Sequence, residues 1–342
     1  MNIKSLLLGS AAALAVVSGA QAADAIVAAE PEPMEYVRVC DAFGTGYFYI
    51  PGTETCLKIG GYVRAQIDIE HDDAADEYVW DAWTRGRVEV SAKNDSELGT
   101  IGSFIALQSE GDEDYDDSGF YLDEAYITVG GFKVGYLYNY WDTGLAGEAD
   151  DLGSNLINSA GYEYASDAFK VGVFVDELSD SYASGFDAAY GDNDSIGIEA
   201  LVGGTFGVVS ANLLGSYDFA QEDGAVRLIV EAEVGPGTLG VAGIYSSGAN
   251  AYYDVSEWTV AASYAIKLTD KLSLTPGAQY YWNYGMLTSE DFADDNNAWN
   301  VGLTLDYALA EGLALKANVE YFDEEAADDG EWNGFVRLQR SF

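Results

Sequence analysis

The stretch LKIGGYVRAQIDI, residues 57–69, alternates apolar and polar side chains along most of its length. Its apolar members share one face: Leu57, Ile59, Val63, Ala65, Ile67 and Ile69. Successive side chains of a strand point to opposite sides, so this period of two predicts a strand with one apolar and one polar face. The same alternation recurs in residues 80–92, 258–268, 299–307 and 313–321. The chain is therefore predicted to be all-β.

The connections between the expected strands are alternately short and long. Short turns are expected at 93–99, 130–131, 166–168, 203–205, 235–238, 269–271 and 310–312. Long connections are expected at 70–78, 110–119, 141–153, 178–194, 218–224, 246–256, 284–297 and 323–331. Together they join about sixteen strands, as in a transmembrane antiparallel up-and-down β-barrel with short periplasmic turns and long extracellular loops. We place this barrel in residues 57–342.

Aromatic residues mark both ends of some apolar strand faces. Trp299 and Tyr307 lie eight residues apart, which is about 26 Å in an extended strand. With a tilt of about 40°, this spacing covers roughly 20 Å along the membrane normal, close to the apolar band between the aromatic girdles of membrane barrels. A soluble sandwich has no reason to place Trp and Tyr at opposite ends of a buried face. The pattern therefore favours a membrane barrel.

The charge of the chain is strongly negative and unevenly distributed. Its 342 residues include 58 Asp and Glu against 15 Lys and Arg, for a net charge of −43. A polyanion of this kind does not bind nucleic acid by neutralising phosphates. The eight expected long loops contain 33 of the acids and no Lys or Arg. Such a rim concentrates cations and repels anions, with an effect that salt screens.

The N-terminus has the organisation of an export signal. Lys4 precedes an apolar run from Leu6 to Val17, which is followed by Ala20-Gln21-Ala22. The run is too short to span a bilayer as a helix. We interpret residues 1–22 as a signal peptide cleaved after Ala22, which predicts export through the inner membrane and a location in the cell outer membrane. The alternative is a buried apolar helix.

Two cysteines lie between this signal and the first barrel strand. Cys40 and Cys56 flank a segment rich in Gly and Tyr. Export to an oxidising compartment favours a disulfide, and two thiols without a His or Cys cluster do not form a zinc site. We therefore predict a periplasmic N-terminal segment, residues 23–56, that contains a Cys40–Cys56 disulfide. Two free thiols are the alternative.

The segment YVRVCDAFGTGYFYIPGTETCLKIGGYVRAQ, residues 36–66, resembles the mature N-terminus of alphaproteobacterial porins of the Brucella and Rhizobium type. The end of the chain, GFVRLQRSF (334–342), is also similar to that family. Its final residue, Phe342, resembles the terminal aromatic that the barrel assembly machinery reads. The resemblance implies a homotrimeric, sixteen-stranded general-diffusion porin whose third outer loop folds into the lumen.

Basic residues of the first two strands are predicted to line the lumen. Alternation places Lys58, Arg64, Arg85 and Arg87 on the polar face. An arginine on the lipid face near mid-membrane would cost about 2–4 kcal/mol, which favours the lumen. The loop centred near residue 74 brings Arg64 roughly across from Arg85. We interpret these four residues as a basic wall of the pore constriction, although they could instead be paired with acids and neutralised.

The third long connection, WDTGLAGEADDLG (141–153), is the loop that the resemblance folds inward. It contains four acids and no base: Asp142, Glu148, Asp150 and Asp151. Opposite the basic wall, these acids would create a transverse field that orients polar solutes and rejects apolar ones. The alternative is a solvated acidic surface loop.

These features predict passive diffusion of small hydrophilic solutes and ions, with a preference for cations. A substrate-specific channel, for example for sugars, is the main alternative, because Trp83, Phe104, Tyr126 and Tyr281 could face inward. An enzyme is disfavoured, since a Ser-His relay needs a base and the only histidine is His71. A structural or adhesive barrel is a further alternative. We predict no cofactor and no metal site, and we expect outer-membrane lipids and lipopolysaccharide as partners.

Overall fold

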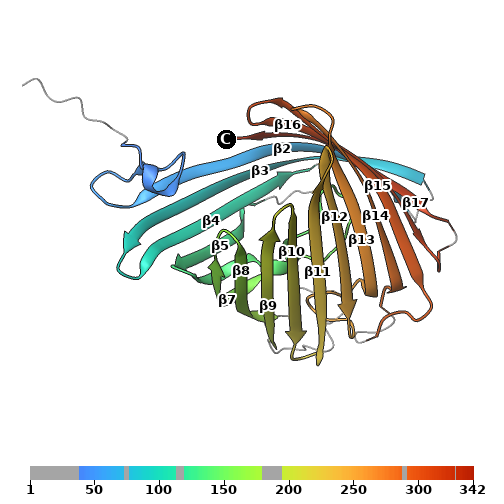
Figure 1. Cartoon of the computed structure of the whole chain (residues 1–342). Coiled ribbons are helices and arrows are strands. Elements are labelled where there is room, and N and C mark those ends of the chain that lie inside the picture. Colours follow the sequence, from blue (N-terminus) through green and yellow to red (C-terminus); the bar gives the residue numbers. More distant parts are fainter. Residues whose placement is uncertain (1–37, 73–76, 113–118, 179–194, 287–290, 328) are drawn as a thin grey trace, which may run out of the picture. The chain divides into compact units, whose positions relative to one another are not determined.

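Sixteen antiparallel strands form a barrel in the computed structural model, which describes residues 38–72, 77–112, 119–178, 195–286, 291–327 and 329–342 (Figure 1). The strands are β2 (Cys56–Asp72), β3 (Glu77–Ser96), β4 (Gly99–Gly111), β5 (Tyr121–Val129), β6 (Phe132–Tyr138), β7 (Leu156–Ala165), β8 (Phe169–Leu178), β9 (Ser195–Phe206), β10 (Val209–Asp218), β11 (Asp223–Val234), β12 (Gly237–Ser246), β13 (Ser256–Lys267), β14 (Leu272–Tyr284), β15 (Asn297–Ala310), β16 (Leu313–Glu324) and β17 (Glu331–Ser341).

The barrel closes by pairing its first strand with its last. Each of the strands from β2 to β17 pairs antiparallel with the next, and β17 returns to pair with β2. The C-terminus therefore lies beside β2 (Figure 1). The predicted class, barrel and strand number are confirmed. One predicted turn was wrong: residues 203–205 belong to β9, and the chain turns after Phe206 at Gly207, whose φ of +67° suits glycine.

The two faces of the sheet differ as the alternation predicted. Outward side chains are apolar and exposed, such as Val171, Val173 and Val175 on β8. Inward side chains on the same strand are buried, and they include Phe174 and Asp176. A large exposed apolar surface combined with a polar interior is typical of a barrel whose outer face contacts lipid.

Among the described residues, no helix is long and apolar enough to span a membrane.

A short hairpin precedes the barrel at the end where the connections are short. The two-residue strand β1 (Phe48–Tyr49) pairs with the start of β2, and Cys40 and Cys56 form the predicted disulfide. The Lys58 and Lys93 ammonium groups lie 6.0 and 5.6 Å from the centroid of the Tyr47 ring. Residues 39–55 belong to the same compact unit as the barrel. The predicted signal peptide, residues 1–22, lies outside the described residues.

Replacing both cysteines with serine should loosen this hairpin and leave the barrel intact. A cross-link with a sequence separation of 16 stabilises by roughly 3 kcal/mol through loop-closure entropy. The Ile50 amide, which donates to the Thr55 carbonyl, should therefore exchange its hydrogen about 100-fold faster. Amides of β12 and β13 are the internal control. Unchanged exchange at Ile50 would mean that pairing with β2 holds the hairpin without the bridge.

Candidate functional site

The third loop, residues 139–155, enters the lumen, and its base is held by one buried arginine. Arg227 on β11 is 2% exposed. Its Nη1 donates to the carbonyl oxygens of Trp141 and Leu152, each at 2.8 Å, and its Nη2 donates to the Tyr140 carbonyl at 2.7 Å. Arg227 thus joins the two ends of the loop. On the other side, the Tyr140 amide donates to the Glu199 carboxylate at 3.2 Å.

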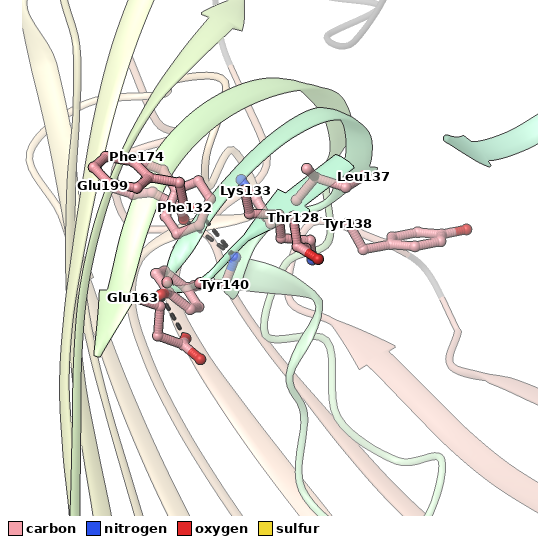
Figure 2. Close-up of a pocket in the computed structure, with 12 residues that line it drawn as sticks. Thr128, Phe132, Lys133, Leu137, Tyr138, Tyr140, Glu163, Phe174 and Glu199 are labelled. Atoms are coloured by element: carbon pink, nitrogen blue, oxygen red, sulfur yellow. Dashed lines mark hydrogen bonds between the residues drawn. The ribbon is translucent and has the colours of Figure 1, made fainter. Parts of the chain in front are cut away.

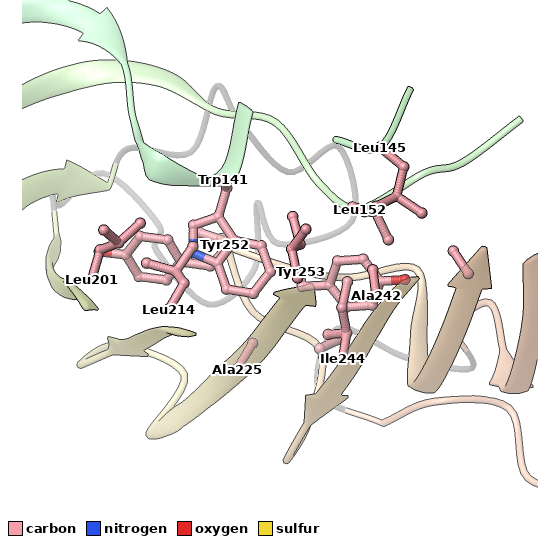
Figure 3. Packing of buried hydrophobic residues seen from close by; sticks show 14 of the residues in the cluster. Trp141, Leu145, Leu152, Leu201, Leu214, Ala225, Ala242, Ile244, Tyr252 and Tyr253 are labelled. Carbon is pink, nitrogen blue, oxygen red and sulfur yellow. The ribbon is translucent and has the colours of Figure 1, made fainter. Parts of the chain in front are cut away.

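The sixth loop, residues 247–255, packs on the base of the third loop. Trp141 is fully buried between Tyr252 and Tyr253, with ring centroids 6.4 and 6.0 Å away (Figure 3). The Tyr252 hydroxyl donates to Asp176 at 2.6 Å. Leu152 and Leu145 extend this apolar cluster along the third loop (Figure 3). The main apolar core of the described barrel is therefore built under a loop, and it fixes that loop.

The middle of the third loop lies against the inner wall. Gln279 on β14 exchanges two hydrogen bonds with the backbone of Asp151: its Oε1 accepts from the amide at 2.6 Å and its Nε2 donates to the carbonyl at 2.8 Å. Gly302 on β15 makes room for Ala149, because a Cβ at Gly302 would lie 2.7 Å from the Ala149 Cβ. The third loop is thus folded into the lumen, as predicted.

The tip of the loop reaches strands near the closing seam of the barrel. Glu148 forms an ion pair with Lys316 on β16, and its Oε1 is 3.9 Å from Nη1 of Arg337 on β17. The other three acids are engaged within the loop. Asp142 accepts from the Ser154 hydroxyl, Asp150 from the Leu145 amide and Asp151 from the Gly153 amide. Of the four acids predicted to face the basic wall, only Glu148 contacts a basic side chain of the described barrel.

Burial alters the titration of two of these loop acids, Asp150 and Asp151. It raises the pKa of the Asp150 carboxyl, and the nearby charges of Asp151 and Glu148 act in the same direction. The hydrogen bond from the Leu145 amide opposes this shift, because it favours the ionised form. The loop therefore takes up a proton at a higher pH than a free carboxyl would.

The predicted basic wall divides into neutralised and unneutralised members. Arg64 and Arg85 are opposite each other in the β2–β3 register, as expected. Arg85 pairs with Glu110, however, and Arg87 forms ion pairs with three acids, Glu89, Asp123 and Glu124. Arg64 instead donates from Nε to the Gln339 amide oxygen at 2.9 Å.

Lys58 is separated from the arginines. It is six residues from Arg64 on an extended strand, which is about 20 Å, and it lies by the Tyr47 ring of the N-terminal hairpin. The structure thus brings Arg64, Arg85 and Arg87 together but not Lys58.

Three basic residues were not among the predicted site residues. Lys316 and Arg337 lie on the polar faces of strands that do alternate in sequence, so parity alone places them inward. Their contact with Glu148 depends on barrel closure, for which the sequence gives no register. Arg227 interrupts the apolar run AVRLIV, and its isolation there was the only available signal.

The predicted inward aromatics are largely covered by cations or by one another. The Arg85 guanidinium lies 5.0 Å from the Trp83 ring, and the Lys133 ammonium lies 4.2 Å from the Tyr126 ring. Phe104 stacks on Tyr126 at 5.2 Å. Tyr281 is only 4% exposed. These rings do not form a continuous open aromatic track.

A half-open cavity of about 260 Å³ lies beneath the base of the third loop (Figure 2). The Tyr140 hydroxyl donates to Glu163 at 2.7 Å at its edge, and the ring of Tyr140 packs edge-on against Phe174. Lys133 and Glu199 also line it. Polar groups thus line the lumen on this side of the loop as well.

The predicted assembly signal, Phe342, and the single histidine lie at opposite ends of the barrel. Phe342 is 64% exposed and exchanges backbone hydrogen bonds with Gly61 at 3.0 and 3.3 Å, which extends the β17–β2 pairing. His71, near the end of β2 that carries a long connection, lies 3.7 Å from Glu331.

A closed barrel with a lipid-type outer face, a polar interior and a loop across its lumen defines the class of transmembrane β-barrel channels. The porin subfamily model matches residues 24–337. The chain is 47% identical over 356 residues to outer membrane protein IIIA of Rhizobium leguminosarum bv. viciae, covering all of this chain and 95% of that protein.

Two further comparisons agree with this match. Porin Omp2a of Brucella canis is 32% identical over the whole length of both chains. The trimer form of OmpT, an outer membrane protein of Vibrio cholerae, shares the fold with a TM-score of 0.59 at 13% identity, covering 85% of this chain and all of that one. The chain belongs to the porin family, whose members are channels and not enzymes, and its fold and relatives support a location in the outer membrane.

Proposed function

We propose that the protein is a general-diffusion channel for small hydrophilic solutes and ions, with a preference for cations. The observation that carries this proposal is the third loop, which is fixed at its base, middle and tip across a polar lumen. A fixed loop narrows the passage by size. The charged and amide groups that remain around it bind water and polar solutes without selecting one compound.

The preference for cations follows from the acidic rim. The seven predicted long loops other than the third hold 29 acids without Lys or Arg, and two of the three predicted wall arginines are neutralised by neighbouring acids. The wall therefore opposes the field of the rim only weakly, and cations should be enriched where solutes enter.

Reconstitution into planar bilayers should give open channels with a cation preference that falls at high salt. Raising the ionic strength from 0.1 M to 1 M shortens the screening length from about 10 Å to 3 Å, so the field of the rim then acts over a shorter range. Reversal potentials in KCl gradients measure the preference, and liposome swelling with neutral solutes of graded size measures the exclusion limit. Folded but electrically silent protein would contradict the proposal.

The substrate-specific alternative is less well supported. A sugar channel needs exposed aromatic faces to stack on pyranose rings, whereas Trp83 and Tyr126 each have a cation over the ring. Swelling rates that follow solute size alone would favour the general channel, and one sugar entering far faster than its isomers would favour the alternative.

We also propose that the protein works as a homotrimer. The outward face of β3 and β4 combines the small residues Ala82, Thr84 and Ser103 with the large exposed apolar residues Trp80 and Ile105. This mixed apolar surface could pack against a second copy. OmpT of Vibrio cholerae forms a trimer.

Export and assembly complete the proposal. Residues 1–22 direct the chain through the inner membrane and are cleaved, Phe342 presents the signal to the barrel assembly machinery, and the acidic outer loops lie among the lipopolysaccharide headgroups. The lipid-exposed position of Phe342 at the end of the closing pair supports its part in this proposal.

A further inference from the structure

Two arginines at the closing seam of the barrel each donate from Nε to a neutral side-chain amide oxygen. The register places Arg64 opposite Gln339 and Gln66 opposite Arg337. Nε of Arg64 donates to the Gln339 amide oxygen, and Nε of Arg337 donates to the Gln66 amide oxygen. We call these four residues the seam quartet. The two strands carry the same R-x-Q order, at 64–66 and 337–339, so antiparallel pairing makes the contacts reciprocal.

Aromatic rings support both guanidinium groups from one side. Arg64 lies 4.9 Å from the centroid of the Tyr62 ring, and Arg337 lies 4.3 Å from that of Phe335. The amide oxygens orient the guanidinium planes through Nε, and the aromatic rings attract a cation without supplying a negative charge that would neutralise it. The terminal amino groups of each guanidinium are therefore presented in a fixed direction with their charge intact.

The charge of this pair is poorly neutralised by comparison with the rest of the lumen. Arg64 makes no ion pair with any residue that the structure describes. Arg337 has one long ion pair there, 3.9 Å from its Nη1 to the Glu148 Oε1, and Lys316 shares that same oxygen. In contrast, Arg87 forms ion pairs with three acids. The two seam arginines of the described barrel therefore keep N–H donors that are not bound to carboxylates and that could bind an anion.

A cavity adjoins the quartet on this side. Its volume is about 190 Å³, and it is lined by Arg64, Asp306, Ala314, Lys316, Arg337 and Gln339. Three of these side chains are cationic and one is acidic. Asp306 lies 3.6 Å from Lys316, which is also paired with Glu148. Because Asp306 and Glu148 both pair with Lys316, the charges of the two arginines remain available to a solute.

From these contacts we propose that the seam quartet, together with Lys316, is a binding subsite for small oxyanions, with carboxylate-bearing solutes as its preferred class. Guanidinium groups bind carboxylates through paired N–H donors, which chloride cannot match because it is a single spherical acceptor. The inference rests on the proposed channel function and adds a solute class to it. The acidic rim repels an oxyanion. Once an oxyanion has passed the rim, the guanidinium groups of the seam can donate hydrogen bonds to it.

Competition measured on single channels tests the subsite. Succinate added to a KCl solution should reduce the chloride current of the wild-type channel, and the half-blocking concentration should rise at least about tenfold in the Arg64→Gln/Arg337→Gln double variant, since charge-assisted hydrogen bonds are lost. Inorganic phosphate serves as a second oxyanion. Stronger block by succinate than by phosphate supports the carboxylate preference, and equal or stronger block by phosphate overturns that preference.

Two single variants complete the design. Lys133→Gln removes a lumen cation that lies over Tyr126, away from the seam, and should leave succinate block unchanged. Glu148→Gln removes the acid near Lys316 and Arg337 and should strengthen block several-fold, which keeps the test decisive if the double variant does not assemble. Equal loss in Lys133→Gln, or no change in either seam variant, would overturn the inference. Absence of channels in the wild-type protein would instead refute the proposed function.

Discussion

The Arg227→Met variant should lose at least about 3 kcal/mol of stability, because three buried loop carbonyls lose their donor and each unsatisfied group costs about 1–3 kcal/mol. The guanidinium contacts the carbonyls of Tyr140, Trp141 and Leu152, so its removal releases both ends of the third loop at once. Buried Glu199 would also lose the nearby charge of Arg227, with Lys133 remaining in the same cavity. We expect a lower unfolding midpoint in urea, read by intrinsic tryptophan fluorescence.

The same variant should also have noisy channels. A third loop released at its base would move in and out of the lumen and give rapid current fluctuations, whereas the wild-type current should be quiet. Lys170→Met is the matched control, because Lys170 is a lumen cation 5.5 Å from the Tyr140 ring and donates to no carbonyl of the loop. Normal stability and quiet channels in Arg227→Met would show that the aromatic packing with the sixth loop holds the base alone.

Replacing Gly302 with leucine should displace the middle of the third loop and narrow the channel. A Cβ at this position would lie 2.7 Å from the Ala149 Cβ and 2.9 Å from the Glu320 Cγ. Because Arg227 holds the base, the loop can only lift away from β15 toward the lumen axis. Overpacking of this kind costs about 1–3 kcal/mol, and we expect a lower single-channel conductance and a smaller exclusion limit in liposome swelling.

Gly215→Leu provides the comparison for this substitution. Gly215 lies on β10. A Cβ at this position would have the Val226 Cγ2 as its nearest neighbour, at 4.0 Å. The loop should therefore not move, and conductance should stay at the wild-type value. If Gly302→Leu raises conductance, the loop has detached from the wall instead of lifting from it, and the contact of Glu148 with Lys316 is weaker than we infer.

The strand order and barrel could be predicted because side-chain alternation is a local property of the chain. The wrong turn at 203–205 shows where local reasoning fails. Gly203 and Gly204 have the composition of a turn, but both are paired with β8 on one side and with β10 on the other, where Gly203 lies opposite Asn212. A Cβ at Gly203 would lie 2.1 Å from the Asn212 side-chain oxygen. These glycines mark a close contact, which the sequence alone cannot distinguish from a turn.

The lumen residues could be assigned to the inner face, but their partners could not. Arg64 and Arg85 lie on the two strands of one hairpin, so the position of its loop was enough to predict that they are opposite each other. Arg87 is neutralised in part by Asp123, the extra residue of an irregularity in the β4–β5 pairing. A one-residue bulge of this kind changes which side chain points inward. The sequence pattern here did not predict it.

The third loop shows the same limit over longer distances. Its acids suggested an opposing charged surface, yet hydrogen bonds to Ser154, Leu145 and Gly153 hold three of them within the loop. The contact of Glu148 with Lys316 spans 168 residues of sequence. It exists only because the chain closes into a barrel, and it depends on the exact position of the loop tip.

The pairing of β2 with β17 also constrains the order in which the barrel forms. Gln66 and Arg337 are separated by 271 residues, whereas every other pair of neighbouring barrel strands is consecutive in the chain. Local hairpins can therefore form early, while this contact requires the ends of nearly the whole chain to meet and comes late. Until then Arg64 and Arg337 lack their amide acceptors. The residues that we assign to oxyanion binding would thus come into register only in a completed barrel, so partly assembled chains should lack the subsite.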